Sequence, residues 1–310
     1  MHALASTFSL RLRCLKPFRS QTVLALTSLL SLGAAVGCSA SAPSGFSASG
    51  YHVRGAKVYY HGGFGISSPV ELTGADAASF RKLDDIEPRS YYAQDKSNVY
   101  YCGKVMPEAQ PATFVRMRNA YARDARQVYY QGYAISSDAA NFKLLDELAG
   151  KDSRRVYWCG HVISEDAPNF RYVGHSGAVA YHRDRQQVFA NGIRIEGADS
   201  ATFRILSQTY SRDSKRVYQL TKPVFGADSN TFQVLTRFYT KDASQVFWDG
   251  KLIAGANPET FVILNEDSHC SHDGVHAYHW NNVIRGADPA TFPVGKKCRS
   301  CWENRIVFEE

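Results

Sequence analysis

The segment HCSHDGVHAYH, residues 269–279, gathers four histidines and one cysteine in a short stretch. Two further cysteines, Cys298 and Cys301, follow in the sequence CRSC. Imidazole and thiolate groups are ligands that Zn²⁺ prefers, whereas paired thiols can instead form a disulfide. The composition of this region therefore allows two chemistries, a metal site or a covalent cross-link.

Strand geometry divides the histidines. Alternate residues of a strand share a face, so His272 and His276 are expected on one side and His269 and His279 on the other. This division disfavours a site that uses all four imidazoles. We therefore expect no metal or other cofactor, and keep one alternative ligand set, which consists of His272, His276, Cys298 and Cys301.

The N-terminus has the features of an export signal. Residues 1–20 carry four basic side chains and no acidic one, and an uncharged apolar run extends from Gln21 to Gly37. The run is shorter than the roughly 20 apolar residues that span a bilayer. Its end, Ala35-Val36-Gly37-Cys38, resembles a bacterial lipobox. The resemblance implies removal of residues 1–37 and acylation of Cys38; the alternatives are an ordinary cleaved signal and an uncleaved anchor.

Residues 38–50 are rich in Ser, Ala and Gly and predict a flexible tether after the lipid. Ser39 resembles the sorting residue of lipoproteins that two-membrane bacteria send to the outer membrane. We therefore expect a protein of the cell envelope, anchored in a membrane through its lipid. The outer membrane is the favoured location, with the protein facing the periplasm or the cell surface.

Charge argues against nucleic-acid binding. The chain has 36 basic and 29 acidic residues, and four of the basic ones lie in the signal. The remainder is nearly balanced, with the two signs interleaved and without a long basic run.

The rest of the chain consists of one repeated pattern. A phenylalanine recurs at intervals of about 29 residues, with a small polar residue before it and Asp, Asn or Gln four positions earlier. The eight copies are Phe80, Phe114, Phe142, Phe170, Phe203, Phe232, Phe261 and Phe292. A second element has the form Tyr-x-basic-Asp-x-x-x-Val-aromatic, as in YARDARQVYYQG and YTKDASQVFWDG. Its aspartates are Asp95, Asp124, Asp152, Asp184, Asp213, Asp242 and Asp273.

This pattern resembles the DKNYY repeat family of exported bacterial proteins, through motifs such as DKSNVYYCG at residues 95–103. The resemblance covers residues 51–295, which we take as the repeat domain, and leaves residues 296–310 as a C-terminal tail with the CxxC motif. It implies export but no particular activity.

Each unit predicts strands, a hairpin and one helical turn. Val-aromatic pairs favour strands, and Asn191-Gly192 and Asp249-Gly250 suit two-residue hairpin turns. In GADPATF, Asp288 can cap a helical turn that Pro289 begins. We expect an all-β domain of eight β-meander repeats, each with three strands, stacked in a curved or twisted array. The alternative is a closed, eight-bladed, propeller-like ring, which we disfavour because the units are short for four-stranded blades.

The recurring aspartates have two interpretations. Calcium requires six to eight oxygen ligands. Each aspartate, however, has a basic residue beside or near it, and no repeat supplies a dense acidic loop. An aspartate that accepts hydrogen bonds from backbone N–H groups of its own turn is the favoured interpretation.

The repeat pattern also restricts the disulfide. Cys14 leaves with the signal, and Cys102 and Cys159 occupy one position two repeats apart, too distant to bond. Export to an oxidising compartment favours a disulfide between Cys270 and either Cys298 or Cys301. An odd number of cysteines leaves at least one free thiol or implies an intermolecular bond.

No motif of a known catalytic site is present in a credible context, and we expect no enzyme. The favoured function is a lipid-anchored scaffold that binds a protein or another envelope component. The alternative is a periplasmic immunity-type protein that neutralises a toxin; metal binding and enzymatic activity are less favoured. The second aromatic of each copy is expected on an exposed face, and the binding candidates are Tyr101, Tyr130, Trp158 and Trp248.

Overall fold

The computed structural model describes residues 49–62, 68–83 and 91–310. The predicted signal, the lipid-bearing Cys38 and most of the tether lie outside these residues. The chain divides into two compact units, Met1–Ala167 and Pro168–Glu310.

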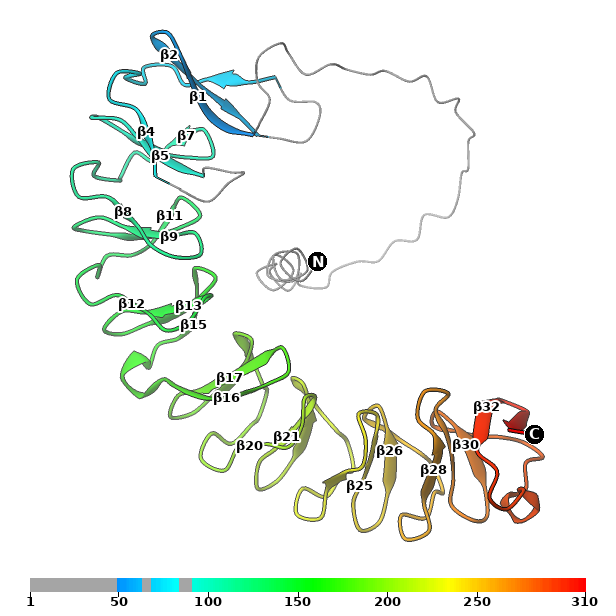
Figure 1. Cartoon of the computed structure of the whole chain (residues 1–310). Helices are drawn as coiled ribbons and strands as arrows, with labels where there is room; N and C mark the ends of the chain where they lie inside the picture. The colour runs from blue at the N-terminus through cyan, green and yellow to red at the C-terminus, as the bar shows by residue number, and fades with distance from the viewer. Residues whose placement is uncertain (1–48, 63–67, 84–90) are drawn as a thin grey trace, which may run out of the picture. The chain divides into compact units, whose positions relative to one another are not determined.

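The described residues of unit 1 form one three-stranded and three four-stranded antiparallel sheets (Figure 1). The first sheet consists of β1 (Gly50–Arg54), β2 (Lys57–His61) and β3 (Val70–Glu71). The second consists of β4 (Arg81–Lys82), β5 (Tyr92–Gln94), β6 (Val99–Tyr101) and β7 (Lys104–Val105). The third consists of β8 (Val115–Arg116), β9 (Tyr121–Arg123), β10 (Val128–Tyr130) and β11 (Tyr133–Ser136). The fourth consists of β12 (Lys143–Leu144), β13 (Ala149–Lys151), β14 (Val156–Trp158) and β15 (His161–Ser164).

Unit 2 contains four four-stranded sheets and a final hairpin. Its first sheet consists of β16 (Arg171–Ser176), β17 (Val179–Arg183), β18 (Val188–Ala190) and β19 (Ile193–Arg194). The next two are β20 (Arg204–Ile205), β21 (Tyr210–Arg212), β22 (Val217–Gln219) and β23 (Lys222–Pro223), then β24 (Gln233–Val234), β25 (Tyr239–Lys241), β26 (Val246–Trp248) and β27 (Lys251–Leu252). The last are β28 (Val262–Asn265), β29 (Cys270–His272), β30 (Ala277–His279) and β31 (Asn282–Val283), then β32 (Cys298–Trp302) and β33 (Arg305–Phe308). The short 3₁₀ helices are η1 (Ala167–Asn169) and η2 (Pro289–Thr291).

The prediction of an all-β chain of tandem meander repeats is confirmed, because strands that follow one another in sequence are neighbours in every sheet. The prediction of three strands per repeat is wrong. Each complete repeat has four strands, which fit into so few residues because most strands contain only two or three. The choice between an open array and a closed ring depends on how the two units are placed and stays a prediction.

The core lies between consecutive sheets. In most repeats the recurring phenylalanine packs between a tyrosine of one sheet and an aromatic residue of the next. Phe80 lies 5.5 Å from Tyr51 and 5.7 Å from Tyr100, between ring centroids. Such tilted contacts stabilise aromatic pairs beyond the burial of their area. A single repeat thus leaves its aromatic residues half covered, and its neighbour completes the core.

The predicted turns are confirmed at their characteristic positions. Asn191 and Gly192 both have positive φ, 48° and 75°, as a two-residue type I′ hairpin requires. At η2 the Asp288 side chain accepts a hydrogen bond from the Ala290 N–H, and Pro289 stands at the first helical position. Within the described residues, no helix has the length and apolar character needed to cross a membrane.

Candidate functional site

The recurring aspartates connect each helical turn to the loop that follows it. Asp213 is 3% exposed. Its Oδ1 accepts hydrogen bonds from the N–H groups of Lys215 and Arg216, at 2.7 and 2.8 Å. Its Oδ2 accepts one from the Tyr218 hydroxyl, at 2.8 Å, and one from the N–H of Asp199, at 2.9 Å. Asp95, Asp124 and Asp273 accept the same four kinds of bond.

These bonds determine the charge of the aspartates and confirm the turn interpretation. Burial alone would raise the pKa of Asp213, but the four donated hydrogen bonds hold it below the ordinary value. The carboxylate is therefore ionised at neutral pH. Its oxygens are already engaged by backbone and tyrosine donors, which leaves little capacity for a calcium ion.

The small polar residue before each phenylalanine is a second link between turn and loop. The Thr202 hydroxyl donates to Asp199 Oδ2 at 2.6 Å and accepts from the Ser214 N–H at 3.0 Å. Thr231 makes the same two contacts in the next repeat, to Asp228 and from the N–H of Ala243. The helical turn is thus attached to the repeat that follows it.

The basic residue of the motif holds the same helical turn from the preceding repeat. In unit 1, Lys151 Nζ donates to the Ala167 carbonyl at 2.9 Å. In unit 2, Lys241 Nζ donates to the Pro258 carbonyl at 2.8 Å. Arg183 and Arg212 donate in the same way to the carbonyls of Ser200 and Ser229. In unit 2, a cation from one repeat and a carboxylate from the next therefore hold the turn between them, as Arg212 and Asp242 hold the turn 228–231.

Open grooves lie beside these contacts. In unit 1, a groove of about 400 Å³ is lined by residues that include Thr113, Val115 and Arg123. In unit 2, a groove of about 470 Å³ occupies the corresponding place beside Lys241. Its other lining residues include Asn230, Thr231, Gln233 and Glu259. The recurrence of grooves at repeat boundaries makes them the candidate binding sites.

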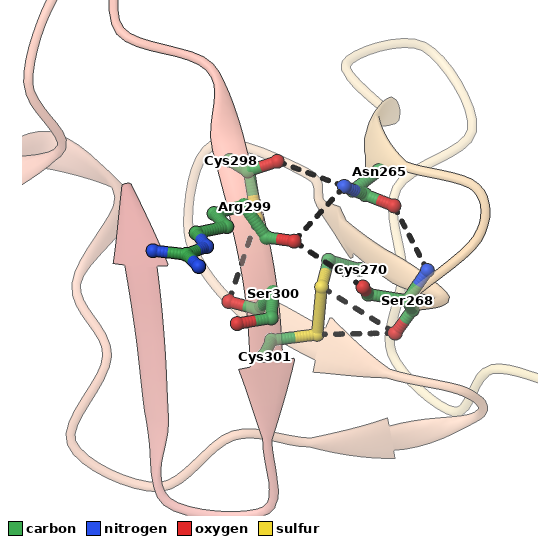
Figure 2. Close-up of a disulfide and its surroundings, with 7 residues drawn as sticks. All are labelled: Asn265, Ser268, Cys270, Cys298, Arg299, Ser300 and Cys301. Atoms are coloured by element: carbon green, nitrogen blue, oxygen red, sulfur yellow. Dashed lines mark hydrogen bonds between the residues drawn. A yellow bond between two sulfur atoms is a disulfide. The ribbon is translucent and has the colours of Figure 1, made fainter. Parts of the chain in front are cut away.

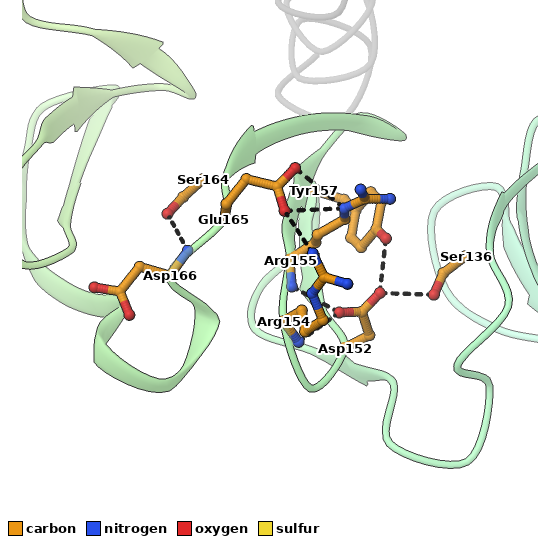
Figure 3. Close-up of polar contacts among 8 residues, drawn as sticks. All are labelled: Ser136, Asp152, Arg154, Arg155, Tyr157, Ser164, Glu165 and Asp166. Carbon is orange, nitrogen blue, oxygen red and sulfur yellow. Dashed lines mark hydrogen bonds and ion pairs between the residues drawn. The ribbon is translucent and has the colours of Figure 1, made fainter.

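A third groove, also of about 400 Å³, lies in unit 1 beside residues 135–138, where the sequence departs from the repeat pattern. The link ISSD is one residue shorter than links such as IEGAD. Ser136 compensates: its hydroxyl donates to Asp152 Oδ2 at 2.7 Å (Figure 3). The same hydroxyl accepts a hydrogen bond from the Asp138 N–H at 3.1 Å. In the same groove, Arg155 Nε lies 3.1 Å from both carboxylate oxygens of Glu165 (Figure 3). The arginine is therefore already neutralised.

The four aromatic binding candidates do not form an exposed face. Tyr130 and Trp158 are only 9% and 7% exposed, and Tyr101 and Trp248 are half-buried. In unit 1 the next sheet covers Tyr101 and Tyr130: a Cβ placed on Gly132 or Gly160 would lie 2.7 Å from the Tyr101 or Tyr130 side chain, respectively. The expectation of an exposed aromatic face is therefore wrong, because alternation within a strand does not show what the neighbouring sheet covers. A binding role for the four residues stays a prediction.

The C-terminal cysteines form the predicted kind of bond. Cys270 and Cys301 are joined by a disulfide, with their Cα atoms 5.9 Å apart (Figure 2). Cys298 keeps a thiol, and burial raises its pKa. A register shift between Cys298 and Ser300 in β32 lets Cys298 and Cys301 both enter one buried cluster with Cys270. The bond removes Cys301 from the alternative metal set.

The predicted grouping of the histidines is wrong, because a turn separates the two strands and alternation does not continue through it. The register pairs Cys270 with His279 and His272 with Ala277, which places His272 and His279 on the same face of the sheet. His279 stacks on Trp280, with ring centroids 4.2 Å apart, and His269 lies 5.3 Å from Trp248. His272 instead packs edge-on against Phe292 at 5.9 Å. Among residues 49–62, 68–83 and 91–310, no group of three or more His, Cys, Asp or Glu side chains has an arrangement suited to a metal ion.

Comparison with known proteins identifies the repeats. A sequence model of the DKNYY family matches residues 51–222 and 215–282. No curated protein and no solved structure matches the chain significantly. The matched segments comprise well over half of the chain and contain the aspartate turns and Val-aromatic strands described above. The chain therefore belongs to the DKNYY family.

Proposed function

We propose that this protein is a lipid-anchored scaffold of the cell envelope that binds its partner in the grooves between consecutive repeats. The observation that carries the proposal is the recurrence of one kind of groove. Grooves in both units lie beside the same contact, in which a basic side chain holds the helical turn. Repeated sites on a regular support suit an extended partner, as in other repeat proteins.

The N-terminal sequence supports the anchor. A basic segment, an apolar run and the Ala35-Val36-Gly37-Cys38 sequence together favour acylation of Cys38. Ser39 favours the outer membrane, with the repeats facing the periplasm or the cell surface. The tether that follows gives the repeat domain freedom to reach a partner.

The use of the polar residues supports binding rather than catalysis. The recurring carboxylates accept backbone and tyrosine hydrogen bonds, and the recurring cations donate to backbone carbonyls. We therefore do not propose an enzyme. The partner is an envelope component that meets the grooves from outside.

The anchor can be tested by expressing the full chain and the Cys38→Ala variant in a two-membrane bacterium. We expect the wild type in the outer-membrane fraction, with a mature mass that begins at an acylated Cys38. The variant is expected in the soluble periplasmic fraction or as unprocessed precursor. A wild-type mature mass without lipid would contradict the anchor.

The binding surface can be tested in cells with a photo-crosslinking amino acid. We would place it at the exposed groove positions Gln233 and Glu259, and at the exposed edge positions Leu252 and Val283 as matched controls. We expect adducts at the groove positions alone. Adducts at all four positions, or at none, would refute binding in the grooves.

A further inference from the structure

The strand register places like charges opposite one another. In unit 2, Arg171 of β16 pairs with Arg183 of β17. In the next sheet Arg204 pairs with Arg212, and in the third Gln233 pairs with Lys241. Like charges directly opposite in an antiparallel sheet are destabilising. We call these five cations the cation ladder: Arg171, Arg183, Arg204, Arg212 and Lys241.

The cation ladder is not neutralised by ion pairs. In the part of the chain that the structure describes, its five members form none; ion pairs lie elsewhere, such as Arg194 with Glu196. Three members lie in the second strand of their sheets, are half-buried and donate hydrogen bonds to turn carbonyls; we call these the inner members: Arg183, Arg212 and Lys241. The outer members, Arg171 and Arg204, are exposed at the sheet edge.

Nearby acidic groups are largely occupied. The buried Asp213 beside Arg212 accepts four hydrogen bonds from its own turn and from the preceding one. The exposed Asp199 accepts bonds from the Ala201 N–H and the Thr202 hydroxyl. Glu259 lines the same groove as Lys241, so its carboxylate would compete with an acidic ligand for the lysine. The two arginine pairs therefore carry the strongest uncompensated charge.

The chemistry of the cation ladder points to a particular class of partner. Arginine forks bind carboxylate and phosphate groups through two parallel hydrogen bonds. The charges recur once per repeat, which suits a polymer whose acidic groups recur with neutral segments between them. The neutral side chains of Asn230, Thr231 and Gln233 in the adjoining groove suit sugar hydroxyls. No aromatic ring lines that groove apart from the buried Phe232, so a platform for stacking nucleobases is lacking there.

We propose that the cation ladder of unit 2 binds an acidic glycan, with the two arginine pairs holding successive acidic groups and the groove beside Lys241 holding a neutral sugar. The inference rests on the proposed function, because it names the chemical class of the envelope partner. Binding of the anionic groups also relieves the repulsion within each arginine pair, so the ligand is expected to stabilise unit 2.

The test uses soluble residues 39–310 and labelled polygalacturonate, with neutral dextran and double-stranded DNA as comparison polymers. The ladder variant is Arg171→Gln with Arg204→Gln. The matched control is Lys251→Gln with Arg285→Gln, which removes the same charge from exposed positions of unit 2 outside the cation ladder. We expect polygalacturonate binding to weaken at least about tenfold in the ladder variant and to change less than about twofold in the control. Both variants should keep the wild-type melting temperature or exceed it, because each loses two exposed positive charges.

Three results would overturn the proposal. Equal weakening in both variants would mean diffuse attraction by net charge. Equally tight binding of DNA, with the same loss in the ladder variant, would mean a general polyanion site. Absence of polygalacturonate binding, with groove-specific adducts still formed in cells, would refute the acidic glycan and leave the scaffold function standing.

Discussion

Units 1 and 2 use the same carboxylate contact but different hairpin contacts. Asp124 in unit 1 and Asp213 in unit 2 each accept four hydrogen bonds of the same kinds. At the hairpins, unit 1 places the rings of three tyrosines over glycines of the next sheet: Tyr60 over Gly103, Tyr101 over Gly132 and Tyr130 over Gly160. In unit 2, the same position holds Ala190, Gln219, Trp248 and His279.

The difference shows which contact the repeat requires. A buried carboxylate needs each donor at hydrogen-bond distance, so the residues around it cannot vary freely. The hairpin contact needs only a side chain that covers the next turn. In unit 2, Gln219 meets this need with a hydrogen bond, from its Nε2 to Asp249 Oδ1 at 2.6 Å.

The buried tyrosines differ in a similar way. In unit 1, the Tyr92 hydroxyl donates to the Ala120 carbonyl at 2.8 Å and accepts from the Gly132 N–H at 3.1 Å. The positions of the next sheet that face such a tyrosine hold Ala122 and Gly150 in unit 1, but Thr240 and Ser271 in unit 2. Unit 2 therefore has hydroxyl groups buried between its sheets. Burial raises the pKa of both Tyr210 and Tyr239 to about 12.

Acid is expected to have the largest effect, because it removes the contact that both units share. The pKa values of Asp95, Asp124, Asp152, Asp213 and Asp273 lie below the ordinary value. Their folded-state pKa values are thus below those of the unfolded chain, about 4. The stability they contribute is present above pH 4 and is lost as the pH falls through the folded-state values. Urea unfolding at pH 7, 4 and 3 should show a small loss by pH 4 and a steep one below it, in both units.

Single aspartate substitutions should affect the two units equally. Asp124→Ala and Asp213→Ala each leave buried N–H groups and a tyrosine hydroxyl without their acceptor, and each should cost about 3–5 kcal/mol. The control Asp199→Ala removes only a helical-turn cap, at a cost of about 1 kcal/mol. Urea midpoints would measure all three. A much smaller cost for one aspartate than for the other would break the equivalence of the units.

Loss of the disulfide should affect unit 2 but not unit 1. Cys301→Ser opens a cross-link between residues 31 positions apart, which is expected to cost about 3–4 kcal/mol. Hydrogen exchange should show lost protection in β28–β33 and unchanged protection in β8–β11. Loss of protection throughout the chain would mean that the C-terminal staple stabilises more than its own repeat.

Glycine substitutions should show the smallest difference. Gly132 of unit 1 and Gly255 of unit 2 have nearly the same positive φ, 81° and 79°. A Cβ on Gly132 would lie 2.7 Å from the Tyr101 side chain, whereas one on Gly255 would meet nothing within 4 Å. Gly132→Ala should therefore cost about 2–4 kcal/mol, and Gly255→Ala only the backbone strain of about 1–2 kcal/mol. Equal costs in thermal unfolding would show that the tyrosine ring moves aside freely.

Local features of the fold were predictable from sequence. Asn191-Gly192 specifies a type I′ turn and Asp288-Pro289 a capped helical turn, because each depends only on neighbouring residues. The fourth strand of each repeat, such as Tyr210–Arg212, was missed because three residues are too few for a periodic pattern.

The contacts between repeats were harder to predict. The motif revealed a basic residue at Lys241, but nothing marks the Pro258 carbonyl, 17 residues later, as its partner. Sequence left Cys298 and Cys301 as equal candidates for Cys270, and only the geometry of β32 distinguishes them. The burial of Tyr130 was missed for the same reason: it depends on Gly160, which lies in a different sheet.

The two-sided attachment of the helical turns has an evolutionary consequence. A turn such as 199–202 receives its donor from Arg183 behind and its acceptor from Asp213 ahead. The boundary around Asp228 uses the same chemistry, with Arg212 behind and Asp242 ahead. Duplication or deletion of one whole repeat would therefore join compatible ends and leave the groups of each turn contact with their partners. Such a chain can change its length by recombination while each junction remains intact.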